Sequence, residues 1–386
     1  MRGLRFLLAA TAVSVTGDGM LTAATPLAAA ALSRDPADVG FVAAASTAAW
    51  LVVGVPAGAF VDRWDRRRTM IVSDLVRFLV LGALGLLLLL DRASIGVLAG
   101  AVFVVGVATC FFTPAGIALL RDVAGTDRAT LTIANGRFWS VDAFGRSLAG
   151  PPLGAVAFAV SRALPFLVDA VSFAVSALLL AFVPRGSGPR PAGQLGIADG
   201  VRFLSSDRLL RGLALSAWSF NFAYFLVFAP FVLYAENRLG VGVVGFGLLL
   251  ACGAAGSVVA GMLSGRILAA RGALTVYSAV FAAQAAGWLA ILLVPSIVVA
   301  GVALALIGAA ATIGTVAGQA ARQLATPAGL LGRVAAVHRI ASSGGGTLGA
   351  LAGGFLAVAS DTAPFVVSVV FLVPCAGIAW RAGRRS

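Results

Sequence analysis

Long apolar segments alternate with short polar ones along the whole chain. Runs of roughly 20 apolar residues recur, each long enough to cross about 30 Å of hydrocarbon as an α-helix. The pattern predicts twelve spanning helices, at residues 5–32, 38–61, 69–90, 94–120, 136–160, 164–183, 209–235, 240–266, 273–294, 296–321, 334–358 and 361–380. We therefore expect an all-α integral membrane protein.

One long polar stretch, residues 184–207, divides these spans into two sets of six. It begins with the Pro/Gly-rich PRGSGPRPAGQ and continues as LGIADGVRFLSSDRLL, where apolar residues alternate with charges as in a helix on a membrane surface. The flanking parts, residues 1–183 and 208–386, echo each other. Gly58–Arg63 has a counterpart in Gly261–Arg266, Gly150 in Gly353, and residues 164–166 in 363–365. Two pseudo-symmetric six-helix bundles joined by a linker are a transporter architecture.

Composition narrows the class of protein. Of 386 residues, 60% are hydrophobic and only 11% are charged, which a soluble domain could not accommodate on its surface. The net charge of +13 comes entirely from arginine, which we attribute to a GC-rich coding sequence, so no nucleic-acid partner is expected. Neither a nucleotide-binding loop nor a metal-ligating cysteine pattern is present, so we expect no cofactor and no metal.

The arginines also predict the orientation. If the N-terminus is cytoplasmic, the outside loops contain only Arg34, Arg92, Arg162 and Arg238, and Arg77 and Arg146 lie within spans. The remaining arginines fall inside. The positive-inside rule then places both termini in the cytoplasm of a cell, as expected for a multi-pass bacterial plasma-membrane protein.

The first span carries a stripe of polar residues on one helical face. Its members are Thr11, Ser14, Asp18, Thr22 and Thr25, spaced by three or four residues. A carboxylate in mid-membrane costs roughly 2.5–3.5 kcal/mol and persists where it faces water or a partner. Burial favours the neutral form of an acid, so Asp18 is our first candidate for a proton-coupling group. A static pair with a neighbouring helix is the alternative.

Other intramembrane charges have less definite roles. Asp142 and Arg146, one turn apart in the span 136–160, could carry and modulate a proton or form a static bridge. The sequence suggests no partner for Asp169 in the span 164–183.

Two sequence motifs resemble signature motifs of the major facilitator superfamily. The loop GAFVDRWDRRR, with Gly58, Asp62, Arg63, Arg66 and Arg67, resembles its G-x-x-x-D-R-x-G-R-R signature, although Asp65 replaces the second glycine, as in the macrolide-efflux and enterobactin-exporter-like branch. AGPPLG, at residues 149–154, looks like the core of the antiporter motif. The resemblance implies that the loop acts as a conformational latch, in which we include Asp74 and Arg77. It also implies that Gly150, Pro151 and Gly154 permit close helix packing.

In that superfamily the first, fourth, seventh and tenth helices line the substrate cavity. Polar and aromatic residues occur at helical spacing in these spans of our chain. The resulting candidates are Thr22, Thr109, Thr113, Trp218, Asn221, Phe225, Phe228, Thr312, Thr315 and Gln319. Aromatic rings beside few charges suit an amphipathic or aromatic ligand, although ordinary core packing explains any single phenylalanine.

These observations favour a monomeric, non-enzymatic exporter that exchanges protons for a small amphipathic compound such as a drug, antibiotic or secondary metabolite. A proton-coupled importer of a sugar or carboxylate is the alternative, but the spans offer few central cations and few amides. A membrane enzyme acting on lipid would need a concentrated catalytic set, and the single histidine, His338, lies near a span end.

Overall fold

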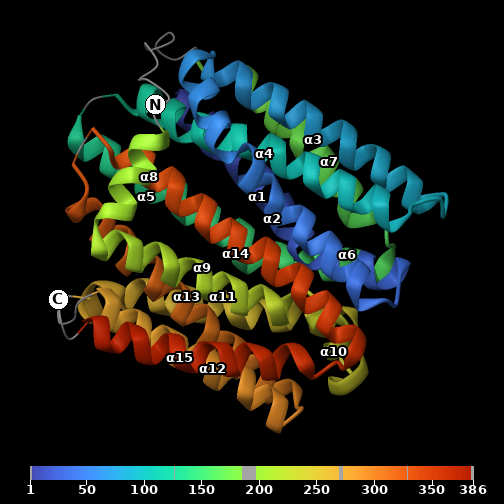
Figure 1. Ribbon diagram of the computed structural model, residues 1–386. Helices are drawn as coiled ribbons and strands as arrows, with labels where there is room; N and C mark the ends of the chain where they lie inside the picture. The colour runs from blue at the N-terminus through green and yellow to red at the C-terminus, as the bar shows by residue number, and fades with distance from the viewer. Residues whose placement is uncertain (1, 126, 185–196, 269–272, 328, 384–386) are drawn as a thin grey trace. The chain divides into compact units, whose positions relative to one another are not determined.

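The computed structural model describes residues 2–125, 127–184, 197–268, 273–327 and 329–383, and all regular elements among them are helical (Figure 1). In chain order the helices are α1 (Arg2–Leu32), α2 (Pro36–Arg63), α3 (Arg66–Leu89), α4 (Ile95–Ala124), α5 (Arg128–Ala143), the π-helix η1 (Phe144–Ala149), α6 (Gly150–Val160), α7 (Leu164–Ala181), α8 (Ile197–Ser206), α9 (Arg208–Phe228), α10 (Phe231–Leu239), α11 (Val243–Leu268), α12 (Ala273–Leu293), α13 (Ile297–Ala325), α14 (Leu331–Ala359) and α15 (Ala363–Gly383).

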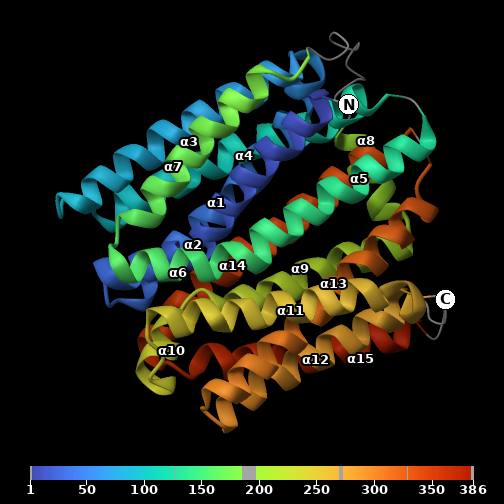
Figure 2. The same ribbon diagram turned by 180° about the vertical axis from the view of Figure 1, so that it is seen from behind.

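Each predicted span coincides with one helix or with consecutive helices, so the all-α, twelve-span fold is confirmed. Nine helices of the described residues are long and apolar enough to cross a membrane, and α9 with α10 makes a tenth, bent by 44°. The two other predicted spans are α14, whose many glycines lower its hydropathy, and the run α5–η1–α6. In Figure 2, α5 and α6 continue one another. The predicted span 209–235 is corrected to a broken one, interrupted at Pro230, which cannot donate a backbone hydrogen bond.

The described chain forms two units. The first comprises Met1–Leu32 with Val52–Leu195, and the second comprises Ser33–Leu51 with Gly196–Ser386. The first half of α2 therefore belongs with the second unit, an assignment that the proposed bundle boundaries did not anticipate. It contacts α14 there: the Thr47 and Thr347 hydroxyls are 2.9 Å apart, and the Arg339 guanidinium lies 4.5 Å from the centre of the Trp50 ring. The predicted duplication of residues 1–183 and 208–386 stays a prediction.

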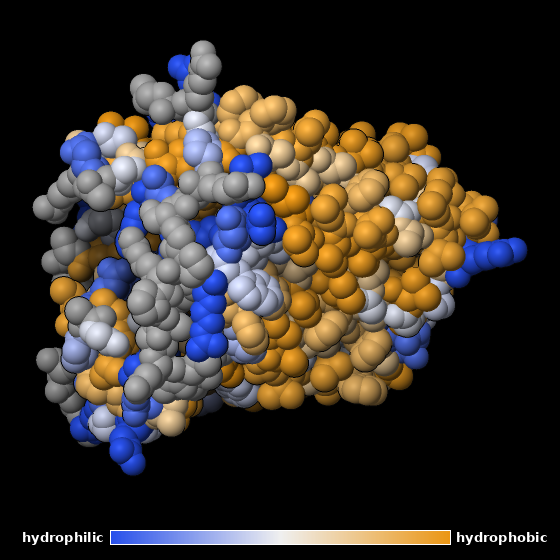
Figure 3. Space-filling view, turned by 90° about the horizontal axis from the view of Figure 1, so that it is seen from above, coloured by the Kyte–Doolittle hydropathy of each residue, from blue (hydrophilic) through white to orange (hydrophobic). Residues whose placement is uncertain are grey.

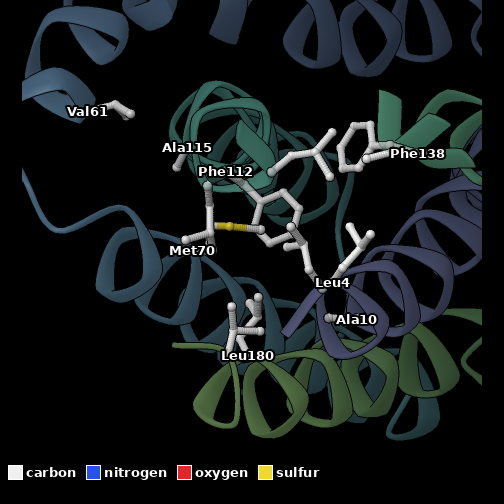
Figure 4. Close-up of a cluster of buried hydrophobic side chains, with 13 residues drawn as sticks. Leu4, Ala10, Val61, Met70, Phe112, Ala115, Phe138 and Leu180 are labelled. Carbon is white, nitrogen blue, oxygen red and sulfur yellow. The ribbon is translucent and has the colours of Figure 1, made fainter. Parts of the chain in front are cut away.

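In the first unit, α1 packs against α6, η1 and α7, and α3 packs against α4 and α7. One end of this unit is filled by a hydrophobic cluster to which α1, α2, α3, α4, α5 and α7 contribute, with Met70 beside Phe112 (Figure 4). The cluster buries apolar side chains of these helices together, away from their mid-helix polar residues.

The second unit packs three helix pairs closely: α9 with α14, α11 with α13, and α12 with α15. Glycines on α14 allow the first approach. A Cβ added at Gly345, Gly349 or Gly353 would lie 2.0–2.3 Å from a backbone carbonyl oxygen of α9. Small residues at such crossings are how membrane helices gain packing without a hydrophobic driving force between them.

The outer surface matches a membrane environment. The face in Figure 3 is broadly apolar, with hydrophilic side chains gathered toward its ends. Several helices start at a capping residue: the carboxylates of Asp65, Asp127 and Asp207 accept backbone N–H bonds at the starts of α3, α5 and α9. Such caps satisfy donors that the helix itself leaves free.

Candidate functional site

The polar stripe of α1 points mainly into the first unit. Thr11 and Ser14 are fully buried, Asp18 is 8% exposed, and Thr22 is exposed, with its hydroxyl 3.5 Å from the Asp18 carbonyl oxygen. The predicted stripe is thus divided: its first part faces neighbouring helices and Thr22 reaches the surface of the unit. Asp18 lies between the two parts.

Asp18 lies between two arginines. Its Oδ2 is 3.0 Å from a terminal nitrogen of Arg146 on η1, and its Oδ1 is 3.7 Å from a terminal nitrogen of Arg77 on α3. The three residues come from three helices that the sequence could not place side by side. Because both cations contact one carboxylate, a change in its charge changes the energy of both.

Arg77 is buried at the centre of the group, where its second terminal nitrogen lies 2.5 Å from Asp74 Oδ1. Its guanidinium carbon lies 4.2 Å from the centre of the Phe112 ring and 4.1 Å from that of Phe173, so aromatic faces contact the cation. The family resemblance groups Asp74 and Arg77 with the loop latch, and this role stays a prediction. The structure places the pair beside Asp18, because α3 carries both residues past the hydrophobic cluster into the interior of the unit.

The π-helix positions the second arginine. In η1 the Gly150 N–H donates to the carbonyl of Gly145, five residues back, and Pro151 and Pro152 follow without N–H groups. Gly145, Gly150 and Gly154 all lie tightly against α1: a Cβ at Gly150 would be 2.4 Å from the Gly19 Cα, and one at Gly154 would be 2.2 Å from the Met20 carbonyl oxygen. The predicted packing residues thus hold Arg146 against Asp18.

Asp142 is the more exposed acid. Its Oδ1 is 3.4 Å from the same nitrogen of Arg146 that contacts Asp18, and its side chain is 24% exposed against 8% for Asp18. The three predicted coupling candidates Asp18, Asp142 and Arg146 therefore lie together. Arg146, at 38% exposed, connects the buried acid with the accessible one.

Asp169 on α7 completes the group, hereafter the carboxylate cluster (Asp18, Asp74, Asp142 and Asp169, with Arg77 and Arg146). It is fully buried, and its Oδ1 accepts a hydrogen bond of 2.9 Å from the Ser172 hydroxyl. An acid in the middle of an apolar span was the sequence signal for it, and its position beside Gly17 of α1 was not predictable. The cluster contains four carboxyl groups against two guanidinium groups.

The loop residues lie elsewhere. Arg66 pairs with Asp122 of α4, and an Arg67 terminal nitrogen donates to the Ala181 carbonyl at the end of α7 over 2.5 Å. Arg63 is exposed, and the surroundings of Gly58 and of the Asp62 side chain lie outside the described part of the chain. Within the described part, the first turn of α3 is thus joined to α4 and to the end of α7 by charge-assisted bonds.

Of the predicted cavity residues in the first unit, Thr22 on α1 is exposed, and the two on α4 are half-buried. Thr109 donates to the Val105 carbonyl, and Thr113 is on the same face. In the second unit Asn221 donates to Ser342 of α14 over 3.0 Å, and Trp218 stacks on Phe222 with the ring centres 5.1 Å apart. Phe225 and Phe228 form an edge-to-face pair next to Tyr224. On α13, Thr312 is half-buried, and Thr315 and Gln319 are exposed.

No grouping of three or more His, Cys, Asp or Glu suited to a metal ion occurs within the described ranges. The carboxylate cluster is instead mixed with arginines, a composition that suits proton exchange and ion pairing. Titratable groups placed in one apolar interior are functional-site candidates on physical grounds.

Comparison with known proteins gives a consistent result. The family profile described as Major Facilitator Superfamily matches residues 7–350. A multidrug efflux pump, Tap, of Mycolicibacterium fortuitum is 30% identical over 227 residues, which are 55% of this chain and 54% of that protein. An uncharacterised transporter of the same superfamily from Bacillus subtilis, YfiS, is 26% identical over 54% of this chain and 51% of its own length. The chain thus spans about half the length of the curated relatives it matches.

Solved structures agree in fold. A bacterial homologue of the human lysosomal transporter Spinster, in an inward-facing and occupied conformation, matches with a TM-score of 0.76 at 17% identity, over 99% of this chain and 96% of that one. A bacterial homologue of the iron transporter ferroportin, in an inward-facing state, matches with a TM-score of 0.79 at 15% identity, over 98% of both chains.

Proposed function

We propose, because this chain belongs to the major facilitator superfamily, that it is a secondary transporter which exports a small amphipathic or hydrophobic compound in exchange for protons. The observation that carries the proposal is the carboxylate cluster. A net negative charge in an apolar interior is costly, and protonation of a carboxyl group is the least expensive way to remove it.

The position of Asp18 supports its role as the main coupling group. It shares Arg146 with the more exposed Asp142, so protonation of Asp18 weakens one contact of Arg146 and leaves the other. A proton that binds there changes the contacts of helices α1, α3 and η1 together. Competition between a proton and a ligand for a transport conformation is what antiport requires.

The chemistry of the second unit supports an amphipathic or aromatic substrate. The faces of α9 and α13 that we assign to the cavity carry Trp218, Phe225 and Asn221 but no acid. The similarity to Tap efflux pumps over about half the chain supports export of drug-like compounds. Uptake of a carboxylate is less well supported, because Arg77 and Arg146 are both already paired with acids.

Transport by the purified protein in liposomes tests this proposal. An imposed proton gradient should drive uphill accumulation of cationic dyes or antibiotics from a panel, and a protonophore should abolish it. The same liposomes without a gradient should show only downhill exchange. Uphill transport that persists with the protonophore, or transport of sugars in place of the panel, would contradict the proposal.

Orientation is part of the same proposal, since the arginine distribution supports cytoplasmic termini. The three native cysteines are first replaced, and single cysteines are then introduced at Asp361 or Ser187. An impermeant thiol reagent added to whole cells should label Asp361→Cys and not Ser187→Cys. The reverse pattern would invert the orientation.

A further inference from the structure

We propose that Asp169 is a second proton-binding group of the carboxylate cluster, neutral in the conformation described here and deprotonated during the transport cycle. The inference rests on the proposed proton-coupled function. The sequence suggests no partner for this residue, whereas its contacts, its burial and the balance of charge around it indicate a role.

The contacts of Asp169 do not suit an ionised carboxylate. Its side chain is fully buried, Oδ1 accepts only the Ser172 hydroxyl, and Oδ2 has no hydrogen-bond partner among the described residues. An unpaired buried charge costs far more than a buried hydroxyl that lacks an acceptor. The neutral acid, with its proton on Oδ2, is therefore the form that fits this site.

The charges facing Asp169 lead to the same conclusion. They are Asp18 on α1, with Asp74 and Arg77 on α3. Helix α6, which also packs on α7, has no charged residue. Arg146 reaches the group through Asp18. The buried set of Asp18, Asp74, Arg77 and Arg146 is balanced by itself, with Asp142 partly in solvent. Ionisation of Asp169 would leave a buried negative charge without a matching cation.

The structure also suggests how Asp169 can lose its proton. Gly17 of α1 packs directly on its carboxyl group, since a Cβ there would lie 1.8 Å from Oδ1. Arg77 Nε has no hydrogen-bond partner among the described residues, and the terminal nitrogen that lies 3.7 Å from Asp18 makes an ion-pair contact but no hydrogen bond. If α1 moves away from α7, water can take the proton from Oδ2, and Arg77 can turn an unused N–H group toward the new carboxylate. Because Asp18 follows Gly17 directly, movement of α1 would alter both acids at once.

Infrared spectroscopy of the purified protein at neutral pH tests the protonation state without any transport assay. The wild-type protein should show the carbonyl stretch of a neutral carboxylic acid, and Asp169→Asn should lose it. Asp142→Asn is the matched control and should retain it. Ser172→Ala keeps the acid but removes the hydrogen bond to Oδ1, so the band should move to higher frequency. Ser172→Ala therefore shows whether Asp169 is protonated even if Asp169→Asn fails to fold. A band that is unchanged in both variants would overturn the inference.

The transport assay tests the second half of the proposal. In liposomes, Asp169→Asn should keep downhill exchange and show weaker uphill export than the wild type. Loss of the infrared band together with wild-type uphill export would show a permanently neutral residue and overturn its role in coupling. If the wild-type protein shows no proton-driven export at all, the proposed function fails, and the infrared result still decides whether Asp169 is protonated.

Discussion

The two units use the same packing device around different chemistry. In the first unit, Gly150 and Gly154 bring α6 onto α1, and in the second, Gly349 and Gly353 bring α14 onto α9. The first unit surrounds its contact with buried acids and arginines. In the described second unit, ion pairs lie near helix ends, at Arg34–Glu236, Arg238–Asp361 and Arg333–Asp199. The interior of the second unit contains aromatic rings and neutral hydrogen bonds such as Asn221 to Ser342.

This difference suggests that the first unit binds protons and the second binds the ligand, although both use similar helix contacts. A group that binds protons needs an acid whose charge matters to several helices, and the first unit has it. A site for an amphipathic ligand needs rings and a few neutral polar groups, and the second unit supplies these.

The largest effect is expected from Asp18→Asn, which mimics the protonated acid. It should abolish proton-driven uphill export while downhill exchange of a neutral ligand continues, because Arg77 and Arg146 no longer respond to protons at this position. Asn221→Ala in the second unit should instead change the KM for the ligand and retain the gradient. Liposome transport with and without a pH gradient measures both. Asp91→Asn, in an exposed loop, is the control. Full uphill export by Asp18→Asn would move the coupling role to Asp142 or Asp169.

A large loss of stability is expected from Arg77→Met. It leaves Asp18 and Asp74 buried without their shared cation, and breaking a buried pair in this way costs about 3–5 kcal/mol. The comparison in the second unit is Gln284→Met, which removes one neutral hydrogen bond to the Phe220 carbonyl and should cost about 0.5–1.5 kcal/mol. Thermal unfolding in detergent gives both values. Equal losses would mean that the buried ion pairs of the first unit contribute no more to stability than a neutral hydrogen bond of the second.

An intermediate effect, shared by both units, is expected at the close helix contacts. Gly154→Val and Gly349→Val place side-chain atoms where backbone atoms of α1 and α9 already lie, and overpacking costs about 1–3 kcal/mol or more. Gly82→Ala and Gly377→Ala, which have no neighbouring atoms within 4 Å, are the controls and should be neutral or mildly stabilising. The yield of folded protein and its thermal unfolding report the outcome. Tolerance of valine in one unit alone would show that the two units do not share this device.

The smallest effect is expected at the charged end of the second unit. The Arg238 guanidinium donates to Asp361 over 2.6 and 3.0 Å and lowers the pKa of this carboxyl group below its usual value. A lowered folded-state pKa stabilises the protein above the unfolded-state pKa of about 3.9, and the contribution disappears as pH falls through the folded-state value. Asp361→Asn should therefore cost about 0.2–1 kcal/mol at neutral pH. The difference from the wild type should vanish in acid, and unfolding curves at several pH values measure it. A difference that grows in acid would exclude this ion pair as the cause.

The sequence by itself determined the spans, because crossing the hydrocarbon is a local property set by the length of an apolar run. It also determined that the first span carries an acid at mid-length. The glycines of α6 were recognisable as packing residues from their motif. Even the π-helix is consistent with the consecutive prolines that follow it, although the sequence did not predict it.

Only the tertiary structure decided which charges meet. Asp74 and Arg77 stand close to the basic loop in sequence, yet α3 carries them to Asp18, and Asp169 joins them from α7. The position of residues 33–51 with the second unit was likewise beyond the pattern of the sequence. The physical reason is that the partners of a buried charge depend on the rotation and closeness of neighbouring helices. These are fixed by glycine contacts and apolar packing between segments far apart in the chain.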